Sequence, residues 1–174
     1  MKVGLVMAGM TDKQITADKV ADLVVRCLVL PLNNVSLVVP NTLIAEVIEY
    51  KPAEASKQSP EWLTGMLSWR GRRVPVISFE HLIGRQTALI NEGRRYVVCN
   101  TVNPNSHIPF IALEVQGIPH LVMVKNEMLE HDSKNHHTEP AVLAHLRLNE
   151  ESVLVPNMEV LEKMLVHLGI TANS

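Results

Sequence analysis

The histidines are the residues of this sequence with the most obvious capacity for chemistry. All eight lie after residue 80, and the densest group combines Glu130-His131-Asp132 with His136 and His137. Imidazole nitrogens and carboxylate oxygens at short range can bind zinc. The H-x-x-x-x-H-H spacing without cysteines is a nonspecific metal pattern, however, and a solvated loop explains it more simply. A metal-dependent enzyme is an alternative, and no metal site is predicted.

The motifs that build common catalytic and cofactor sites are missing from the sequence. Neither glycine-rich phosphate loop occurs, and there is no G-x-S-x-G nucleophile elbow. The two cysteines, Cys27 and Cys99, do not form C-x-x-C and sit in apolar runs, which favours buried reduced thiols. We expect a protein that is not an enzyme and that binds no cofactor.

A second candidate for chemistry is the basic cluster Arg70, Arg72 and Arg73, which could bind RNA on a small barrel. Such barrels interleave basic residues with stacking aromatics, whereas aromatics make up only 3% of this chain. The formal net charge of −2 also argues against a protein that neutralises phosphates. A solvated turn, or an ion pair made by one of the arginines, is the favoured interpretation. An RNA-binding barrel is the other alternative.

Glu46 interrupts the apolar run of residues 43–50, and burying an unpaired carboxylate there would be costly. Arginine suits the capture of a carboxylate. We therefore predict a pair between Glu46 and Arg70 that locks two strands together. Exchanging the two charges should restore the folding that either single change damages.

Composition and the N-terminal sequence limit the remaining function classes. With 47% hydrophobic and 20% charged residues, the chain resembles an ordinary globular protein. The apolar run in MKVGLVMAGM is too short to span a membrane and lacks the features of a signal peptide. We interpret residues 1–20 as a flexible leader and residues 21–169 as a single domain, and we expect a cytoplasmic protein without direct membrane insertion.

Strand-like runs occupy most of the chain. Residues 23–32 and 35–40 flank Asn33-Asn34, which predicts a hairpin with a type I′ turn because asparagine tolerates positive φ. Residues 66–69 and 73–79 flank Arg70-Gly71-Arg72 and predict a second hairpin, with Gly71 at positive φ. Pro75 cannot donate to a ladder, which predicts an edge strand or a bulge at that position.

Further strands are expected at residues 95–103, 108–115, 118–124, 141–148 and 153–155. The chain then ends in a helix, with Asn157 as its N-cap, an apolar face at helical spacing and Gly169 as its C-terminal stop. About nine short strands and one late helix predict a mainly β fold, either a barrel or a sandwich.

The segment from Leu63 to Gly71, followed by Val74-Pro75-Val76-Ile77, resembles the signature of the CheW-like chemotaxis coupling proteins. In that family a G-x-x-x-x-R-G segment precedes an apolar-Pro-Val-Ile strand, and here Gly65 and Arg70 fill the pattern. Residues 37–46 resemble the upstream family segment, in which a strand ends near a proline and a glutamate follows. The resemblance covers roughly residues 23–165.

The resemblance implies two small five-stranded SH3-like β-barrels packed on each other, with a short C-terminal helix. It also implies an adaptor that couples the cytoplasmic tip of a methyl-accepting chemoreceptor to the regulatory barrel domain of a CheA-type histidine kinase. Glu46, Arg70 and Gly71 match the glutamate, arginine and turn glycine of the family. The second half departs from the pattern at Ala112-Leu113 and Pro156-Asn157, which suggests a divergent, ChpC-like paralogue serving a type IV pilus (twitching motility) system.

An adaptor of this kind would act through docking surfaces. We expect a groove between the barrels for a receptor helix tip, and an edge near Val76 and Ile77 for the kinase, with Pro75 resisting uncontrolled strand addition. Trp62 and Trp69 are scarce large aromatics, and an interface position and a core position are equally compatible with each.

Overall fold

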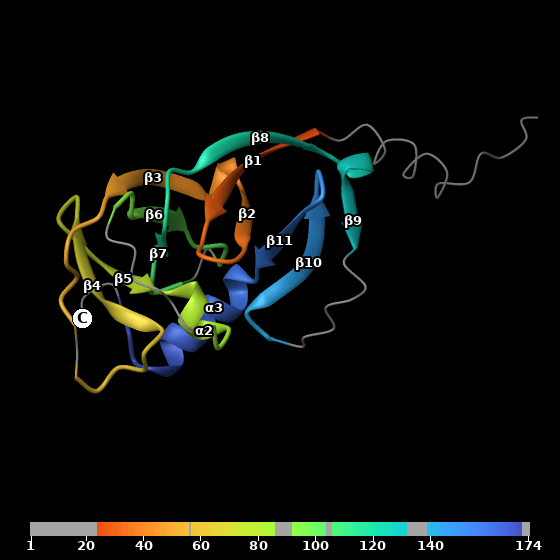
Figure 1. The fold of residues 1–174 in the computed structure, drawn as a ribbon. Helices are drawn as coiled ribbons and strands as arrows, with labels where there is room; N and C mark the ends of the chain where they lie inside the picture. Colours follow the sequence, from red (N-terminus) through yellow and green to blue (C-terminus); the bar gives the residue numbers. More distant parts are fainter. Residues whose placement is uncertain (1–23, 56, 86–91, 104–105, 132–138, 172–174) are drawn as a thin grey trace, which may run out of the picture.

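The computed structural model describes residues 24–55, 57–85, 92–103, 106–131 and 139–171 (Figure 1). The expected leader, residues 1–20, lies outside the described residues, as do Asp132, His136 and His137. The described elements are β1 (Val24–Pro31), β2 (Ser36–Pro40), η1 (Asn41–Leu43), β3 (Ile44–Glu49), β4 (Leu63–Trp69), β5 (Arg72–Ile77), α2 (Phe79–Leu82), β6 (Arg95–Asn100), β7 (Phe110–Val115), β8 (His120–Lys125), η2 (Asn126–Met128), β9 (Leu129–His131), β10 (Val142–Leu148), β11 (Glu151–Pro156) and α3 (Met158–His167).

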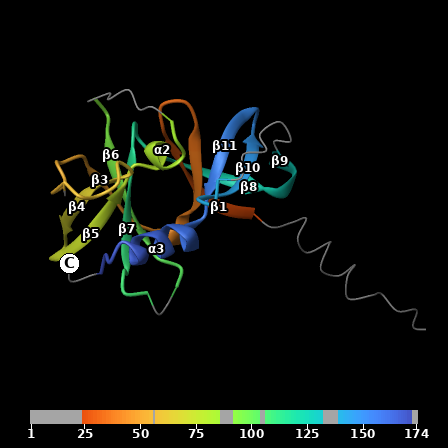
Figure 2. The same cartoon turned by 90° about the horizontal axis from the view of Figure 1, so that it is seen from below.

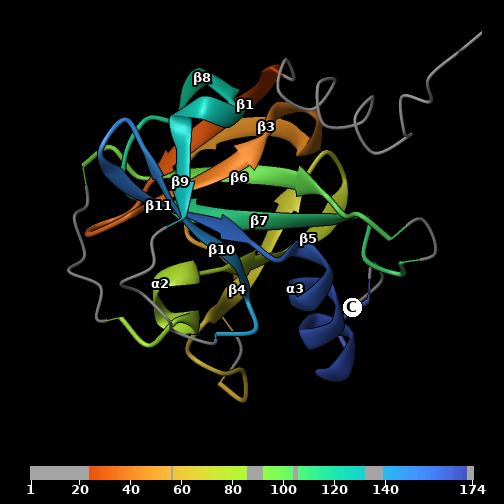
Figure 3. The same cartoon turned by 90° about the vertical axis from the view of Figure 1, so that its right-hand side faces the viewer.

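The first barrel is a six-stranded sheet in the order β8-β1-β2-β11-β10-β9. Its two edge strands, β8 and β9, are joined only by the three residues of η2. Because so short a connection keeps the two edges close, the sheet must curl round on itself (Figure 3). The extra strand beyond the expected five arises because η2 divides this stretch of chain into β8 and β9.

The second barrel is a five-stranded sheet in the order β3-β6-β7-β5-β4. The segment that follows edge strand β3 bridges to the other edge strand, since Glu54 and Met66 exchange two backbone hydrogen bonds of 2.9 and 3.0 Å. This bridge closes the sheet. The predicted mainly β fold of two packed barrels is thereby confirmed.

The chain crosses between the barrels twice. It begins in the first barrel with β1 and β2, builds the second barrel from β3 to β7, and returns to the first with β8 to β11 (Figure 2). Each barrel also contains one parallel pair, β2 with β11 and β5 with β7. A helix follows one strand of each pair, α2 after β5 and α3 after β11. The first barrel therefore combines strands from both ends of the described chain, whereas the second barrel is built from the continuous stretch β3 to β7.

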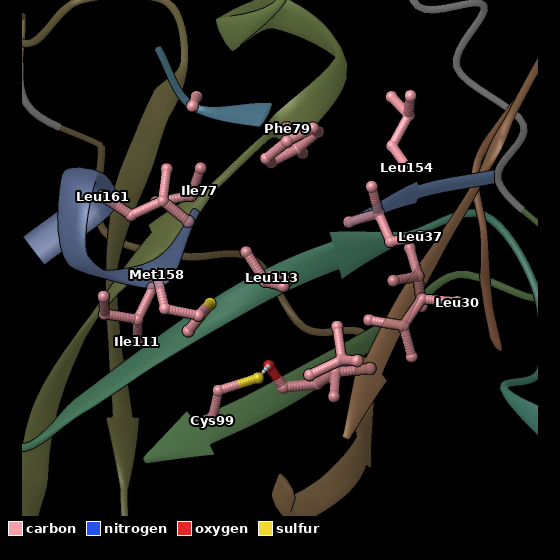
Figure 4. Close-up of a cluster of buried hydrophobic side chains, with 14 of the residues drawn as sticks. Leu30, Leu37, Ile77, Phe79, Cys99, Ile111, Leu113, Leu154, Met158 and Leu161 are labelled. Atoms are coloured by element: carbon pink, nitrogen blue, oxygen red, sulfur yellow. Dashed lines mark hydrogen bonds between the residues drawn. The ribbon is translucent and has the colours of Figure 1, made fainter. Parts of the chain in front are cut away.

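The largest buried cluster fills the space between the two barrels (Figure 4). It joins Leu30 and Leu37 of the first barrel to Ile77 and Leu113 of the second, and α3 adds Leu161. A smaller cluster fills the interior of each barrel. Apolar side chains from both barrels and α3 occupy the space between the barrels. A surface hollow lies beside it, between Val102 and His107 of the second barrel and Val166 of α3, and the expected receptor groove stays a prediction.

Two buried glutamates tie the barrels together in reciprocal fashion. Glu80 of α2 accepts hydrogen bonds from the backbone N–H of Asn33 at 2.8 Å and from its amide group at 3.2 Å. Glu162 of α3 accepts hydrogen bonds from the backbone N–H groups of Val102 and Asn103, at 2.5 and 3.3 Å. Each helix thus holds a loop that belongs to the opposite barrel.

The hairpin at Asn33-Asn34 is confirmed, but its predicted type I′ turn is wrong. Among the described non-glycine residues, positive φ occurs at Arg70, Asn149 and Glu150 alone. The β1–β2 turn closes instead by a hydrogen bond from the N–H of Leu32 to the carbonyl of Val35, at 3.0 Å. The hydrogen bonds from Asn33 to Glu80 hold this loop without a residue in the left-handed conformation that asparagine permits.

The C-terminal helix begins and ends as predicted. The Asn157 side chain accepts a hydrogen bond from the N–H of Val160 at 3.2 Å. At the other end Gly169 has φ of 74°, and the N–H groups of Gly169 and Ile170 return to the carbonyls of Val166 and Leu165. This is a Schellman ending. The short helix α2, by contrast, begins at Phe79, where the sequence predicts the end of a strand.

Candidate functional site

The motif residues Arg70 and Gly71 form the turn between β4 and β5. Arg70 has φ of 48° and Gly71 has φ of 72°, so both lie in the left-handed region that a two-residue type I′ turn requires. Gly71 was predicted in this conformation, and Arg70 was not. A non-glycine residue there is strained, which indicates that the surroundings of Arg70 hold it in place.

Those surroundings are Glu46 and Trp69. One carboxylate oxygen of Glu46, on β3, accepts hydrogen bonds from the Trp69 indole N–H at 2.7 Å and from Arg70 Nε at 3.1 Å. The Arg70 guanidinium also lies 5.0 Å from the centre of the Trp69 ring. The predicted Glu46–Arg70 pair is present, and the indole donor is the contact that sequence reasoning missed.

The position of this cluster explains its structural value. Glu46 lies on β3 and Trp69 on β4, the two edge strands of the second sheet, so the shared oxygen links the edges across the barrel seam. The Arg70 side chain is 68% exposed and that of Glu46 is 36% exposed, so their ion pair is screened by water. The stronger link is therefore the hydrogen bond from the buried Trp69. A charge exchange would not restore it, because an arginine at position 46 cannot accept the indole proton.

Replacing Trp69 with phenylalanine should lower the free energy of unfolding by about 1–3 kcal/mol, because a hydrogen bond to a charged acceptor is lost together with some packing. Replacing Arg70 with alanine should change it by less than about 1 kcal/mol, as for other exposed ion pairs. Urea unfolding of both variants measures the difference. A larger loss in Arg70→Ala than in Trp69→Phe would show that the exposed ion pair, not the indole contact, holds the seam.

The other two arginines of the cluster have partners of their own. Arg73 forms an ion pair with Glu54 at 3.2 Å, and the Arg72 guanidinium lies 5.8 Å from the centre of the Phe110 ring. Phe110 in turn packs edge-on against Trp69, with 4.9 Å between ring centres. These contacts occupy the aromatic rings that an RNA base would need for stacking. The hairpin end is thus a cationic surface whose side chains are already held in position.

Gly65 lies where two backbones approach closely. A Cβ atom at this position would come within 2.6 Å of the Glu54 carbonyl oxygen. That oxygen belongs to the bridge that closes the second barrel. Gly65 is therefore a structural requirement of barrel closure.

The predicted docking edge near Val76 and Ile77 is wrong. Both side chains are fully buried, and β5 lies inside the sheet between β7 and β4. Pro75 is also buried and is not on an edge strand. Proline is tolerated there because β5 pairs with β7 only from Val76 onward, which leaves one side of the strand without a ladder at residue 75.

The two tryptophans occupy different environments. Trp69 is a core residue of the second barrel. Trp62 is half-buried and lines a surface groove beside α3, with the aliphatic side chains of Val160 and Met164 on the other wall. The two residues therefore do not form one site.

A second surface, absent from the site residues predicted from sequence, lies on β1 and β8. Val24, Arg26 and Leu28 alternate along β1 and stand opposite Lys125, Met123 and Leu121 of β8. Directly paired residues project to the same side of a sheet, so these six share one face. We call it the β1–β8 patch. Leu121 is 58% exposed and Met123 is 50% exposed, whereas Leu28 packs against the cluster between the barrels.

Groups with potential reactivity lie apart from these surfaces. In the described part of the chain, no cluster of three or more His, Cys, Asp and Glu side chains is placed to hold a metal ion. Both cysteines are free and buried; burial raises the pKa of the Cys99 thiol to about 12 and also raises that of Cys27. Neither thiol is suited to nucleophilic chemistry at neutral pH. Within the described ranges, no helix is long and apolar enough to cross a membrane.

Comparison with known proteins gives one family and one fold. A family model described as "CheW-like domain" matches residues 26–164, a stretch that includes strands of both barrels. The solved structure of the scaffolding protein TtCheW from Thermoanaerobacter tengcongensis superposes with a TM-score of 0.66 at 13% identity, over 78% of this chain and 86% of that chain. At such low identity this likeness shows the fold alone. No curated protein matches the chain.

Proposed function

Because the chain belongs to the CheW-like domain family, we propose that it is a non-catalytic coupling protein, which joins a chemoreceptor to a CheA-type histidine kinase in the cytoplasm. The observation that carries this proposal is the family match, which extends across both barrels rather than one. A linking role needs two separate docking surfaces on a rigid body. The shared core between the barrels supplies the rigidity.

We assign the receptor tip to the β1–β8 patch. Receptor tips are helical, and a helix can lay an apolar stripe against an apolar surface. The patch offers Leu121 and Met123 for this purpose, and the flexible thioether of methionine adapts to different helix surfaces. Arg26 and Lys125 on the same face would add attraction to acidic residues of the helix.

We assign the kinase to the Arg70–Arg72 hairpin end, in place of the buried Val76 and Ile77. Arg70 and Arg72 are exposed and their guanidinium groups are held over the rings of Trp69 and Phe110. Side chains that are already ordered lose less conformational entropy on binding. The hairpin belongs to the second barrel and the β1–β8 patch to the first, so both partners can bind at once.

We infer the cellular system that this protein serves from the positions where its sequence departs from the family pattern. Ala112-Leu113 and Pro156-Asn157 replace the residues expected from the family pattern, and a histidine-rich segment is added. Ala112 and Leu113 are fully buried in β7, so the first departure changes the core rather than a docking surface. We propose a divergent paralogue in a type IV pilus system, in which residues 21–169 form a single functional domain.

The test is capture of purified partners by the tagged chain: the kinase and a receptor signalling fragment from the same cells. We expect a complex of all three. The double variant Leu121→Glu/Met123→Glu should weaken receptor capture about ten-fold or more, because a charged side chain would have to be desolvated at the contact. Kinase capture by this variant should not change. Arg70→Glu/Arg72→Glu should give the reverse pattern.

Leu143→Glu is the matched control, since Leu143 is a similarly exposed leucine, on β10. It should leave both captures intact. Binding of neither partner by the parent chain would exclude the coupling role. Capture of both partners that is unaffected by either double variant would retain the role but reject the assigned surfaces.

A further inference from the structure

The β1–β8 patch leaves large apolar side chains exposed at the point where the described chain begins. Val24, the first described residue, belongs to the patch and is itself exposed. Figure 1 shows that the N-terminal end of β1 lies beside the end of β8. An uncovered apolar face of this kind usually marks a contact surface.

The sequence that precedes Val24 carries a matching apolar stretch. Residues 3–10 read VGLVMAGM, contain no charged residue and include Val3, Leu5, Val6 and Met7. Residues 11–22 are mostly polar and carry three aspartates (Asp12, Asp18 and Asp22) against two lysines (Lys13 and Lys19), a net charge of −1. The patch contributes the cations Arg26 and Lys125. The apolar stretch thus matches the apolar side chains of the patch, and the single net negative charge of the linker is opposite in sign to the two cations.

Geometry allows the two to meet. The thirteen or so residues between the apolar stretch and Val24 can span up to about 43 Å when extended, whereas the patch covers only about five residues of strand, or about 17 Å. A segment attached to the edge of its own binding surface also has a local concentration in the millimolar range. Even modest intrinsic affinity then produces a substantial bound fraction.

We propose that residues 3–10 cover the β1–β8 patch within the same molecule and compete with the partner that docks there. The occupant is this chain's own N-terminal segment, held by apolar contacts with Leu121 and Met123. Its effect on partner binding rests on the proposed function, since that proposal assigns the receptor to the patch. The covering itself does not depend on that assignment.

The covering is measured by thiol modification in the full-length chain. Cys27 and Cys99 are both buried, so a cysteine introduced by Leu121→Cys is the accessible thiol. We compare its rate of modification by a maleimide with and without the added substitutions Leu5→Asp and Val6→Asp. These should speed modification about five-fold, because they release the segment from the patch. A synthetic peptide of residues 1–12 should slow it again.

Leu143→Cys, on the exposed side of β10, is the matched control and should react at the same rate in both backgrounds. Equal rates at position 121 with and without the aspartates would overturn the proposal. An equal acceleration at positions 121 and 143 would also overturn it, because it would report general loosening. A specific acceleration at position 121 without any gain in receptor capture would support the covering and reject only the receptor's assignment to the patch.

Discussion

Glu114→Gln should lower the free energy of unfolding by about 3–5 kcal/mol, the loss expected when one partner of a buried ion pair is removed. Glu114 of β7 and Arg94, just before β6, form an ion pair in which both side chains are more than nine-tenths buried. Burial opposes the charge on Arg94, but the hydrogen bond and negative charge of Glu114 outweigh it and raise the pKa of Arg94. Glutamine cannot balance that charge.

The aromatic neighbours of this pair would not replace the lost carboxylate. The Arg94 guanidinium lies 3.8 Å from the centre of the Tyr50 ring, and Tyr96 stands opposite Glu114 in the sheet. Burial raises the pKa of Tyr96, so it remains a neutral phenol at neutral pH. The stacking contact with Tyr50 orders the arginine without neutralising it.

Urea unfolding at neutral pH measures the effect of Glu114→Gln. Glu159→Gln is the control, because Glu159 forms an exposed pair with Lys163 and should give no resolvable change. Adding Arg94→Met to Glu114→Gln should recover part of the loss, since no charge is then buried alone. Equal stability of Glu114→Gln and Glu159→Gln would show that the buried pair does not stabilise the sheet.

Glu162→Ala should lower the free energy of unfolding by about 2–3 kcal/mol, because the N–H groups of Val102 and Asn103 lose their shared charged acceptor. Glu80→Ala should have an effect of similar size through Asn33. Each substitution releases a loop of the barrel opposite to the one that its helix follows. The apolar cluster between the barrels remains in both variants, so the barrels should stay together.

Amide hydrogen exchange separates this explanation from general destabilisation. Glu162→Ala should speed exchange at Val102 and Asn103 more than at Asn33, and Glu80→Ala should do the opposite. Glu159→Ala on the exposed side of α3 is the control and should change neither loop. Uniform acceleration at all three amides would show that the carboxylates contribute only to overall stability.

Several features were predictable because neighbouring residues encode them. Gly71 permits a left-handed turn, Asn157 begins α3 and Gly169 ends it, and each acts through its own backbone conformation or a bond to a residue only a few positions away. The Glu46–Arg70 pair was predicted on the premise that a carboxylate in an apolar run needs a cationic partner; the pair is present, although Glu46 is partly exposed. The hydrogen bond that Trp69 donates to Glu46 was not predictable, because the sequence does not indicate which residue accepts an indole N–H.

Which residues lie on the protein surface could not be predicted from sequence, because it depends on how the chain crosses between the barrels. Val76 and Ile77 look like an available edge in sequence, yet pairing with β7 places them inside the sheet. The opposite occurs in β8. Its sequence predicts an ordinary buried strand, yet Leu121 and Met123 are exposed. Strand order decides which side of a strand meets water, and strand order depends on contacts between residues distant in sequence.

The amino-acid sequence by itself determined most of the strands (β3 and β9 excepted), the caps of α3, the left-handed turn glycine and the family of this protein, because those features arise from local backbone preferences and from a short motif. Only the tertiary structure decided that Glu80 and Glu162 hold opposite barrels, and that Arg94 meets Glu114. Those partners lie 47, 60 and 20 residues apart. The two glutamates meet their loops because the barrels pack together, and Arg94 meets Glu114 because β6 pairs with β7. Local sequence patterns do not encode either arrangement.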